Sequence, residues 1–231
     1  MVINEIYHGD YTYYAWVELV NTSNVSVNLT GWVMEAFTEG QGIQRWTLPS
    51  FWINSGGTVT LREQSGTNTS SDLYFGGALV PRYWGNGGSC SLIDAAGVGK
   101  DFVRWGGSTR LPPQGTYWYA GSDPAAGGPP QTLGRDSLST DTDHGSDWKW
   151  QTASRGQTNT WAGRQAALYV GTALGSGWLE LADTSTSSLT TISTSFPWIQ
   201  CMDTSPDGKL YAGRTATLCR VDPLSGLALS Q

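Results

Sequence analysis

Charged residues, cysteine and long apolar runs are all scarce in this chain of 231 residues. Only 14% of the residues are charged, and 13 Lys and Arg against 19 Asp and Glu leave a net charge of −6. The low charge excludes the highly charged, disordered class of proteins. The shortage of basic residues argues against nucleic-acid binding. No apolar run approaches the roughly 18 residues that a membrane span needs, so we expect none.

The sequence also offers little material for catalysis or for metal binding. It contains three cysteines, Cys90, Cys201 and Cys219, an odd number without metal-type spacing. Cys201 and Cys219 could form a disulfide or could be small buried apolar residues. The two histidines, His8 and His144, accompany no nucleophile elbow, zinc, phosphate-loop or dinucleotide motif. We therefore predict no enzyme activity, no cofactor and no metal ion.

Glycine, proline and tryptophan are plentiful, with 30, 10 and 12 copies. They punctuate short segments rich in β-branched and aromatic residues, and no window shows convincing helical periodicity. Short strands at a spacing of roughly 8–12 residues are typical of a β-sandwich or barrel, so the sequence predicts an all-β protein. The expected strands are residues 2–7, 14–20, 29–37, 44–48, 58–62, 73–75, 89–94 and 101–105.

Residues 106–159 have a different character, because Gly-Gly and Pro-Pro pairs interrupt any long strand. We expect this stretch to wrap along the edge of the sandwich. The aromatic residues that would pin it there are Tyr117, Trp118, Tyr119, Trp148 and Trp150.

An internal repeat follows in residues 160–231. Leu168 and Leu210 begin similar segments 42 residues apart, and the matching Asp183 and Asp222 lie 39 residues apart. Periods near 40 residues suit the four-stranded blades of a β-propeller. Two blades cannot close a ring, so we expect about two incomplete blades that form a fragment of a larger repeat domain.

An ordered set of motifs in residues 2–159 resembles the lamin-tail domain. This immunoglobulin-like β-sandwich occurs in nuclear lamins and in many bacterial secreted or surface proteins. The matching segments are Val2-Ile3-Asn4-Glu5-Ile6, Trp16-Val17-Glu18-Leu19-Val20-Asn21, Leu29-Thr30-Gly31-Trp32, Trp46-Thr47-Leu48-Pro49, Gly56-Gly57-Thr58-Val59-Thr60-Leu61, Leu92-Ile93-Asp94 and Leu133-Gly134-Arg135-Asp136.

The resemblance implies that residues 1–159 are a non-catalytic binding or anchoring module. We expect a monomeric module within an exported, multidomain bacterial protein at the cell surface or outside the cell. Its partner would be an unknown protein or a polysaccharide. The alternatives are a secreted hydrolase whose active site lies in missing propeller blades, and a carbohydrate-binding module.

Two groups of acidic residues are candidate sites. Glu5 and Glu18 lie on strands that we expect to be neighbours, and paired carboxylates perform glycoside hydrolysis. Because nothing beside them supplies a cleft, we interpret both as outward strand residues that bind backbone or face a cation. Asp141, Asp143 and Asp147 could begin a calcium loop. A solvated polar turn is the favoured interpretation, because no glutamate closes such a site.

The tryptophans are either core residues or exposed platforms on which a sugar could stack. Among Trp16, Trp32, Trp46, Trp52, Trp84, Trp105 and Trp118, core packing is expected for most. Trp84 and Trp118 are the candidate ligand-binding residues, because each is flanked by another aromatic residue.

Overall fold

The computed structural model divides the chain into two compact units, Met1–Trp161 and Ala162–Gln231. In the first unit it describes residues 1–9, 14–40, 42–76, 87–119 and 123–161. In the second unit it describes the backbone of the strands alone, at residues 167–171, 176–183, 188–197, 201–204, 210–214, 217–221 and 228–229. Each unit is considered by itself.

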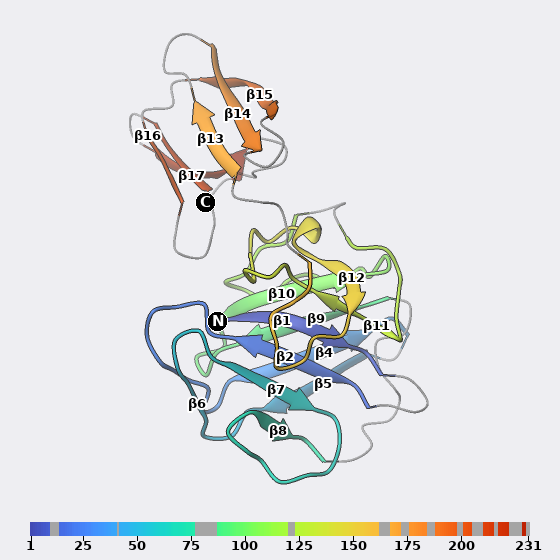
Figure 1. Ribbon diagram of the computed structural model, residues 1–231. Helices are drawn as coiled ribbons and strands as arrows, with labels where there is room; N and C mark the ends of the chain where they lie inside the picture. Colours follow the sequence, from blue (N-terminus) through green and yellow to red (C-terminus); the bar gives the residue numbers. More distant parts are fainter. Residues whose placement is uncertain are drawn as a thin grey trace. The chain divides into compact units, whose positions relative to one another are not determined.

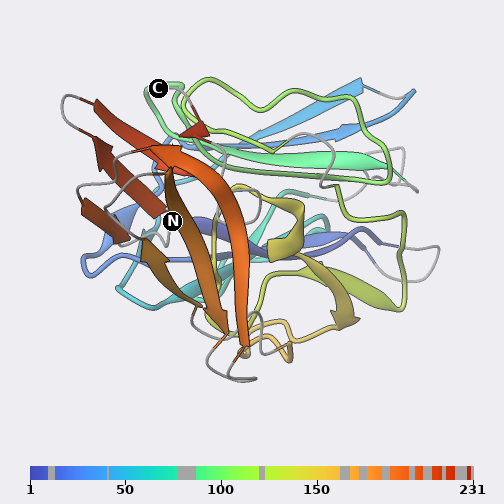
Figure 2. The same cartoon turned by 90° about the horizontal axis from the view of Figure 1, so that it is seen from above.

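Two β-sheets form the layers of a sandwich in the first unit, which confirms the predicted all-β class (Figure 1). The six-stranded sheet has the order β12-β11-β1-β2-β7-β8 and the four-stranded sheet has the order β10-β9-β4-β5. Figure 2, turned by 90°, separates the two layers. Neighbouring strands are antiparallel except β7 and β8. The strands are β1 (Val2–Tyr7), β2 (Trp16–Val20), β4 (Val33–Thr38), β5 (Gly42–Thr47), β7 (Thr58–Arg62), β8 (Asp72–Tyr74), β9 (Gly88–Ile93), β10 (Gly99–Trp105), β11 (Gln131–Gly134) and β12 (Lys149–Thr152).

Side chains from the facing surfaces of the two sheets fill one core. Ile6 and Leu19 come from the six-stranded sheet, Met34 and Leu92 come from the four-stranded sheet, and all are buried. Inward and outward residues alternate along a strand, so each strand contributes every second side chain to this core. The strands predicted from the sequence at 2–7 and 58–62 have the predicted bounds, and the others differ from prediction at one or both ends.

A β-bulge in β1 changes which side chains face the core. Ile3 pairs with Leu19 and Ile6 pairs with Val17, while the register shifts between Ile3 and Glu5. The extra residue reverses the alternation, so that Ile3 and Ile6 both enter the core although they are three positions apart. Glu5 is thereby directed to the outer face of the sheet.

The segment after residue 105 begins as the predicted wrap and then forms two strands that were not predicted. It does run along β10, because Gly99 N donates to Gln114 O at 2.7 Å and Gly106 N donates to Pro124 O at 2.9 Å. It then adds two strands to the six-stranded sheet, since β11 pairs with β1 and β12 pairs with β11. The sequence did not predict these strands, because the Gly-Gly and Pro-Pro pairs of residues 106–159 indicated a wrap in place of strands.

The second unit contains two antiparallel sheets (Figure 1). The first comprises β13 (Ala167–Gly171), β14 (Ser176–Asp183) and β15 (Ser188–Pro197), and the second comprises β16 (Cys201–Thr204), β17 (Leu210–Arg214), β18 (Thr217–Val221) and β19 (Ala228–Leu229). The register places β17 between Cys201 and Cys219. The two cysteines are thus on strands that are not direct neighbours, and whether they form a disulfide stays a prediction.

Helical structure is minimal in the part of the chain that the structure describes. A single 3₁₀ turn, Gly145–Asp147, is capped by the side chain of His144. Among the described residues, no helix has the length and apolar character needed to cross a membrane.

Candidate functional site

The structure describes one of the two tryptophans predicted to bind a ligand. Trp84 lies outside the described residues. Trp118 is only 5% exposed, and its Nε1 donates to Asp123 Oδ1 at 2.7 Å. Its ring packs edge-on against Phe102 with 5.7 Å between centroids. The expected exposure of Trp118 is therefore corrected: the indole packs in the core, where it pins the preceding wrap as predicted.

Glu5 and Glu18 form a buried pair on the outer face of the six-stranded sheet. They are register partners on β1 and β2, and both are 0% exposed. Glu5 Oε1 accepts hydrogen bonds from Thr132 Oγ1 and from Ser154 N. Glu18 accepts from Asn4 Nδ2 at 2.8 Å and from Gly156 N at 2.6 Å. The expected outward orientation and backbone hydrogen bonds are confirmed, and the structure adds that both carboxyl groups are buried.

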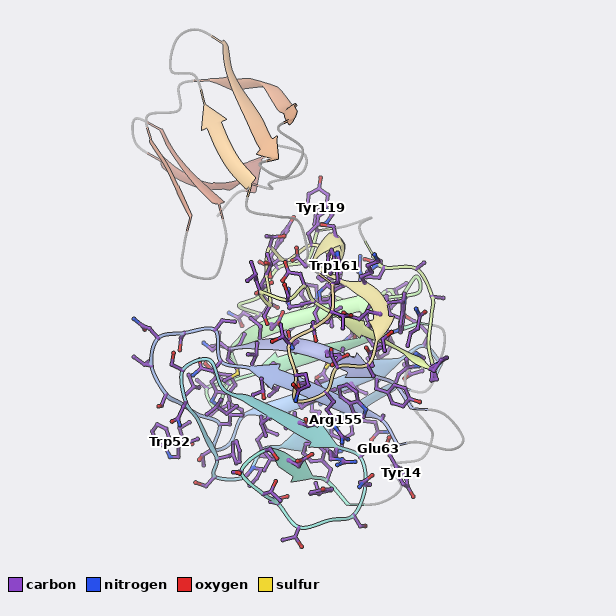
Figure 3. The ribbon with its side chains drawn as sticks, viewed as in Figure 1. Tyr14, Trp52, Glu63, Tyr119, Arg155 and Trp161 are labelled. Carbon is purple, nitrogen blue, oxygen red and sulfur yellow. The ribbon has the colours of Figure 1, made fainter. Side chains whose placement is uncertain are left out.

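The polypeptide that covers this glutamate pair is residues 153–161, which we call the strap. The strap crosses the face of β1 and β2, with Arg155 and Trp161 on it (Figures 1 and 3). Asn159 Nδ2 donates to Asn4 O at 3.2 Å and to Arg135 O at 2.9 Å. The glutamate pair therefore holds the strap, which leads to the second unit.

A second buried group of charges, the arginine cluster, surrounds Arg135 at the end of β11. Its Nη2 lies 2.9 Å from Asp101 Oδ1 and 3.2 Å from Asp141 Oδ1, and its Nη1 lies 3.5 Å from Asp147 Oδ2. The guanidinium also lies 4.5 Å from the centroid of the Trp148 ring. One cation thus links β10, β11 and the loop before β12.

The aspartates predicted as a possible calcium loop belong to this cluster instead. Asp141 and Asp147 direct oxygens to Arg135. Asp147 also accepts from Thr142 N at 2.6 Å. Asp143 has a positive φ of 58° and is buried, so the favoured interpretation of a solvated turn is corrected as well. No group of three or more possible ligand residues is placed to hold a metal ion in the described part of the chain.

Burial raises the pKa values of two carboxyl groups in each cluster. Desolvation raises the pKa of Asp101 to about 7 and that of Asp147 to about 6, against the opposing charge of Arg135. Desolvation also raises the pKa values of Glu5 and Glu18, and the charge of Glu5 adds to the rise at Glu18. For Arg135, the carboxylates outweigh burial and raise its pKa.

These ionisable groups have shifted pKa values, as catalytic groups in active sites do, but the described residues leave a substrate no path to them. A glycosidase needs its two carboxyl groups on either side of a bound sugar. Here the strap lies on the glutamate pair, and the arginine cluster is closed by its own loop. A small pocket elsewhere, lined by Trp16, Trp46 and Phe75 among others, has a volume of about 10 Å³ and holds at most about one water molecule. Both clusters therefore act on the polypeptide itself.

An exposed aromatic residue, Trp52, lies on the small sheet that β3 (Val27–Asn28) and β6 (Trp52–Ile53) form. Trp52 is 63% exposed and projects away from the protein (Figure 3). It pairs with Asn28 across the two strands, so both side chains share the outer face. Ile53, its neighbour, is buried. We call residues 21–30 and 48–57 the uncharged corner, because neither segment contains Asp, Glu, Lys or Arg.

Sequence reasoning missed the role of Arg135, although a signal was present. Arg135 is the only Lys or Arg between Arg110 and Lys149, in a stretch rich in aspartate. A lone cation among several carboxylates predicts an ion-pair centre when the segment is buried. Trp52 also stands out in the sequence, because the residues on either side of it are uncharged. Whether its ring is exposed depends on what packs above it.

Comparison with known proteins gives one match. The family model described as Lamin Tail Domain matches residues 1–170. A search of curated proteins found no match.

Proposed function

The chain belongs to the lamin tail domain family, and from this premise we propose that it is a non-catalytic binding or anchoring module of an exported, multidomain bacterial protein. Domains of this family are generally non-catalytic immunoglobulin-like modules. The proposal rests on one observation: the glutamate pair and the arginine cluster are both covered by the polypeptide itself. Their oxygens bind the strap and Arg135 rather than facing a pocket.

The surface supports recognition rather than chemistry. The glutamate pair and the arginine cluster fix the strap and the loops, so the sandwich is a rigid support for what lies on its surface. Binding and catalytic residues concentrate on loops that such a scaffold positions. Trp52 is a candidate contact, because it is 63% exposed and aromatic side chains contribute much of the energy of interfaces.

The second unit fits the role of a further repeat domain in a longer protein. We propose that its sheets belong to a β-propeller. The antiparallel neighbours β16, β17, β18 and β19 follow one another in chain order, as the strands of a blade do. An extracellular position is proposed from the low lysine content and the many Ser and Thr residues. Export predicts a secretion signal in the parent reading frame, and a parent frame without one would contradict it.

Sedimentation with insoluble polymers tests the binding function. The full chain is mixed with cellulose, chitin, bacterial peptidoglycan and collagen, and both bound protein and soluble products are measured. We expect saturable retention on at least one polymer and no product release. Product release would identify an enzyme, and absence of retention on all four would contradict the anchoring function.

A further inference from the structure

The uncharged corner combines an exposed indole with polar groups that carry no charge. Trp52 offers a ring face to solvent beside Asn28. Asn28 Oδ1 accepts from Thr30 N at 3.0 Å and from Thr30 Oγ1 at 2.6 Å, which fixes the orientation of the amide. With Oδ1 occupied, the amide Nδ2 is the group left to donate to a ligand on the outer face.

The backbone beneath Trp52 is held in place before any ligand arrives. Buried Asn21 donates from Nδ2 to Val25 O at 2.7 Å, to Ile53 O at 3.1 Å and to Asn54 O at 3.1 Å. Asn21 N and O also bond to Gly57 and Gly56. These contacts join the loop before β3 to the C-terminal end of β6 and to the turn that follows it. A fixed platform loses little conformational entropy on binding, which favours affinity.

The chemistry of this surface selects one ligand class. The face of an aromatic ring carries partial negative charge and attracts C–H groups. The ring is also apolar, so covering it with a ligand is favourable. The apolar face of a sugar ring presents such C–H groups, while its hydroxyls match amide and hydroxyl partners. A charged ligand would find no counter-charge in residues 19–34 or 46–61, which contain no Asp, Glu, Lys or Arg.

We propose that the uncharged corner is a binding site for a neutral polysaccharide, with Trp52 as the stacking residue and Asn28 as a hydrogen-bond donor. This inference rests on the proposed binding function and names its ligand class and its site. It transfers the stacking role that the sequence suggested for Trp118 to a different tryptophan, whose ring is free to take it.

Retention of the full chain on defined polymers tests the site. The neutral polymers are cellulose and chitin, the charged polymer is alginate, and phosphatidylcholine vesicles provide a lipid surface. We expect retention on a neutral polymer that is insensitive to salt, because no ion pair is involved. Trp52→Ala should weaken binding about tenfold or more, as for an aromatic hot spot. Asn28→Ala should weaken it about threefold, as for one hydrogen bond.

Two controls separate binding from folding. Tyr14→Ala removes another exposed aromatic residue, 52% exposed, which Figure 3 places on the opposite side of the unit from Trp52. It should leave retention unchanged. Trp52→Phe keeps an aromatic face and should retain most of the binding. Each variant should keep the urea midpoint of the parent chain, since these side chains are exposed.

The outcomes distinguish the site from the general function. Retention that survives Trp52→Ala would overturn the site while leaving the binding module intact. Retention on alginate alone would overturn the neutral ligand class. Vesicle binding that Trp52→Ala abolishes would replace the polysaccharide with a lipid surface. Retention on none of these polymers and on no vesicle would overturn the site, and the proposed function would then depend on retention on peptidoglycan or collagen.

Discussion

The glutamate pair and the arginine cluster are both buried and acidic, but they are compensated in different ways. In the arginine cluster, three aspartates share one guanidinium. In the glutamate pair, N–H and O–H groups from Asn4, Thr132, Ser154 and Gly156 take the place of a cation. The arginine cluster joins its loops through ion pairs, and the glutamate pair holds the strap through hydrogen bonds that it accepts. Removing a partner should therefore have different consequences in the two places.

The largest effect is expected from Arg135→Met, which keeps the length of the side chain but removes its charge. Asp101, Asp141 and Asp147 would be left buried without a cation, and breaking such a network costs about 3–5 kcal/mol of unfolding free energy. Urea unfolding of the full chain, followed by circular dichroism, measures the loss.

Arg45→Ala is the matched control for Arg135→Met. Arg45 also pairs with a carboxylate, Glu35, at 2.8 Å, but its own side chain is 60% exposed. Because buried Glu35 keeps its ion pair with Arg110 at 2.6 Å, loss of the mostly exposed Arg45 side chain should cost at most about 1 kcal/mol. If the two variants lost equal stability, the arginine cluster would have no special role.

A smaller effect is expected at the glutamate pair, and it should differ between its members. Glu18 accepts through both oxygens, so in Glu18→Gln an amide NH₂ would face a donor, from either Asn4 or Gly156. One unsatisfied buried donor costs about 1–3 kcal/mol. Glu5 Oε2 has no partner among the described residues, so Glu5→Gln can keep its hydrogen bonds and should be nearly neutral. Urea midpoints that rank the two variants in the reverse order would contradict this geometry.

The dependence of stability on pH should have the same sign in both clusters. The pKa of Asp101 rises from 3.8 to about 7 and that of Asp147 from 3.8 to about 6 in the native state. Between these values the native protein binds more protons than the unfolded chain, so stability falls as pH increases. We expect the melting temperature to decrease between pH 4.5 and pH 7.5.

Substitution shows which cluster carries the pH dependence. Asp101→Asn removes from the titration the carboxyl group whose pKa is raised to about 7, and should flatten the decrease near neutral pH. Glu5→Gln removes a carboxyl group of the other cluster whose pKa is raised by burial, and it should also make the decrease smaller. A melting temperature that increased with pH over this window would contradict the raised pKa values.

Local sequence patterns were sufficient for most strands and insufficient for the site. The strands 2–7 and 58–62 were predicted at their bounds because alternation and turn residues are local signals. The bulge in β1 could not be predicted, because it depends on pairing with β2. That bulge directs Glu5 outward, and the strap then covers it. The sequence therefore predicted the two glutamates as neighbours but not as a buried pair.

The amino-acid sequence by itself determined the β class, the scarcity of charge and the presence of uncharged segments around Trp52, since composition and periodicity need no partner. The tertiary structure alone decided burial. Trp118 and Trp52 are chemically identical, yet one donates to Asp123 in the core and the other projects into solvent. Their difference arises from which distant segments pack against each ring, and that depends on contacts between residues far apart in the chain.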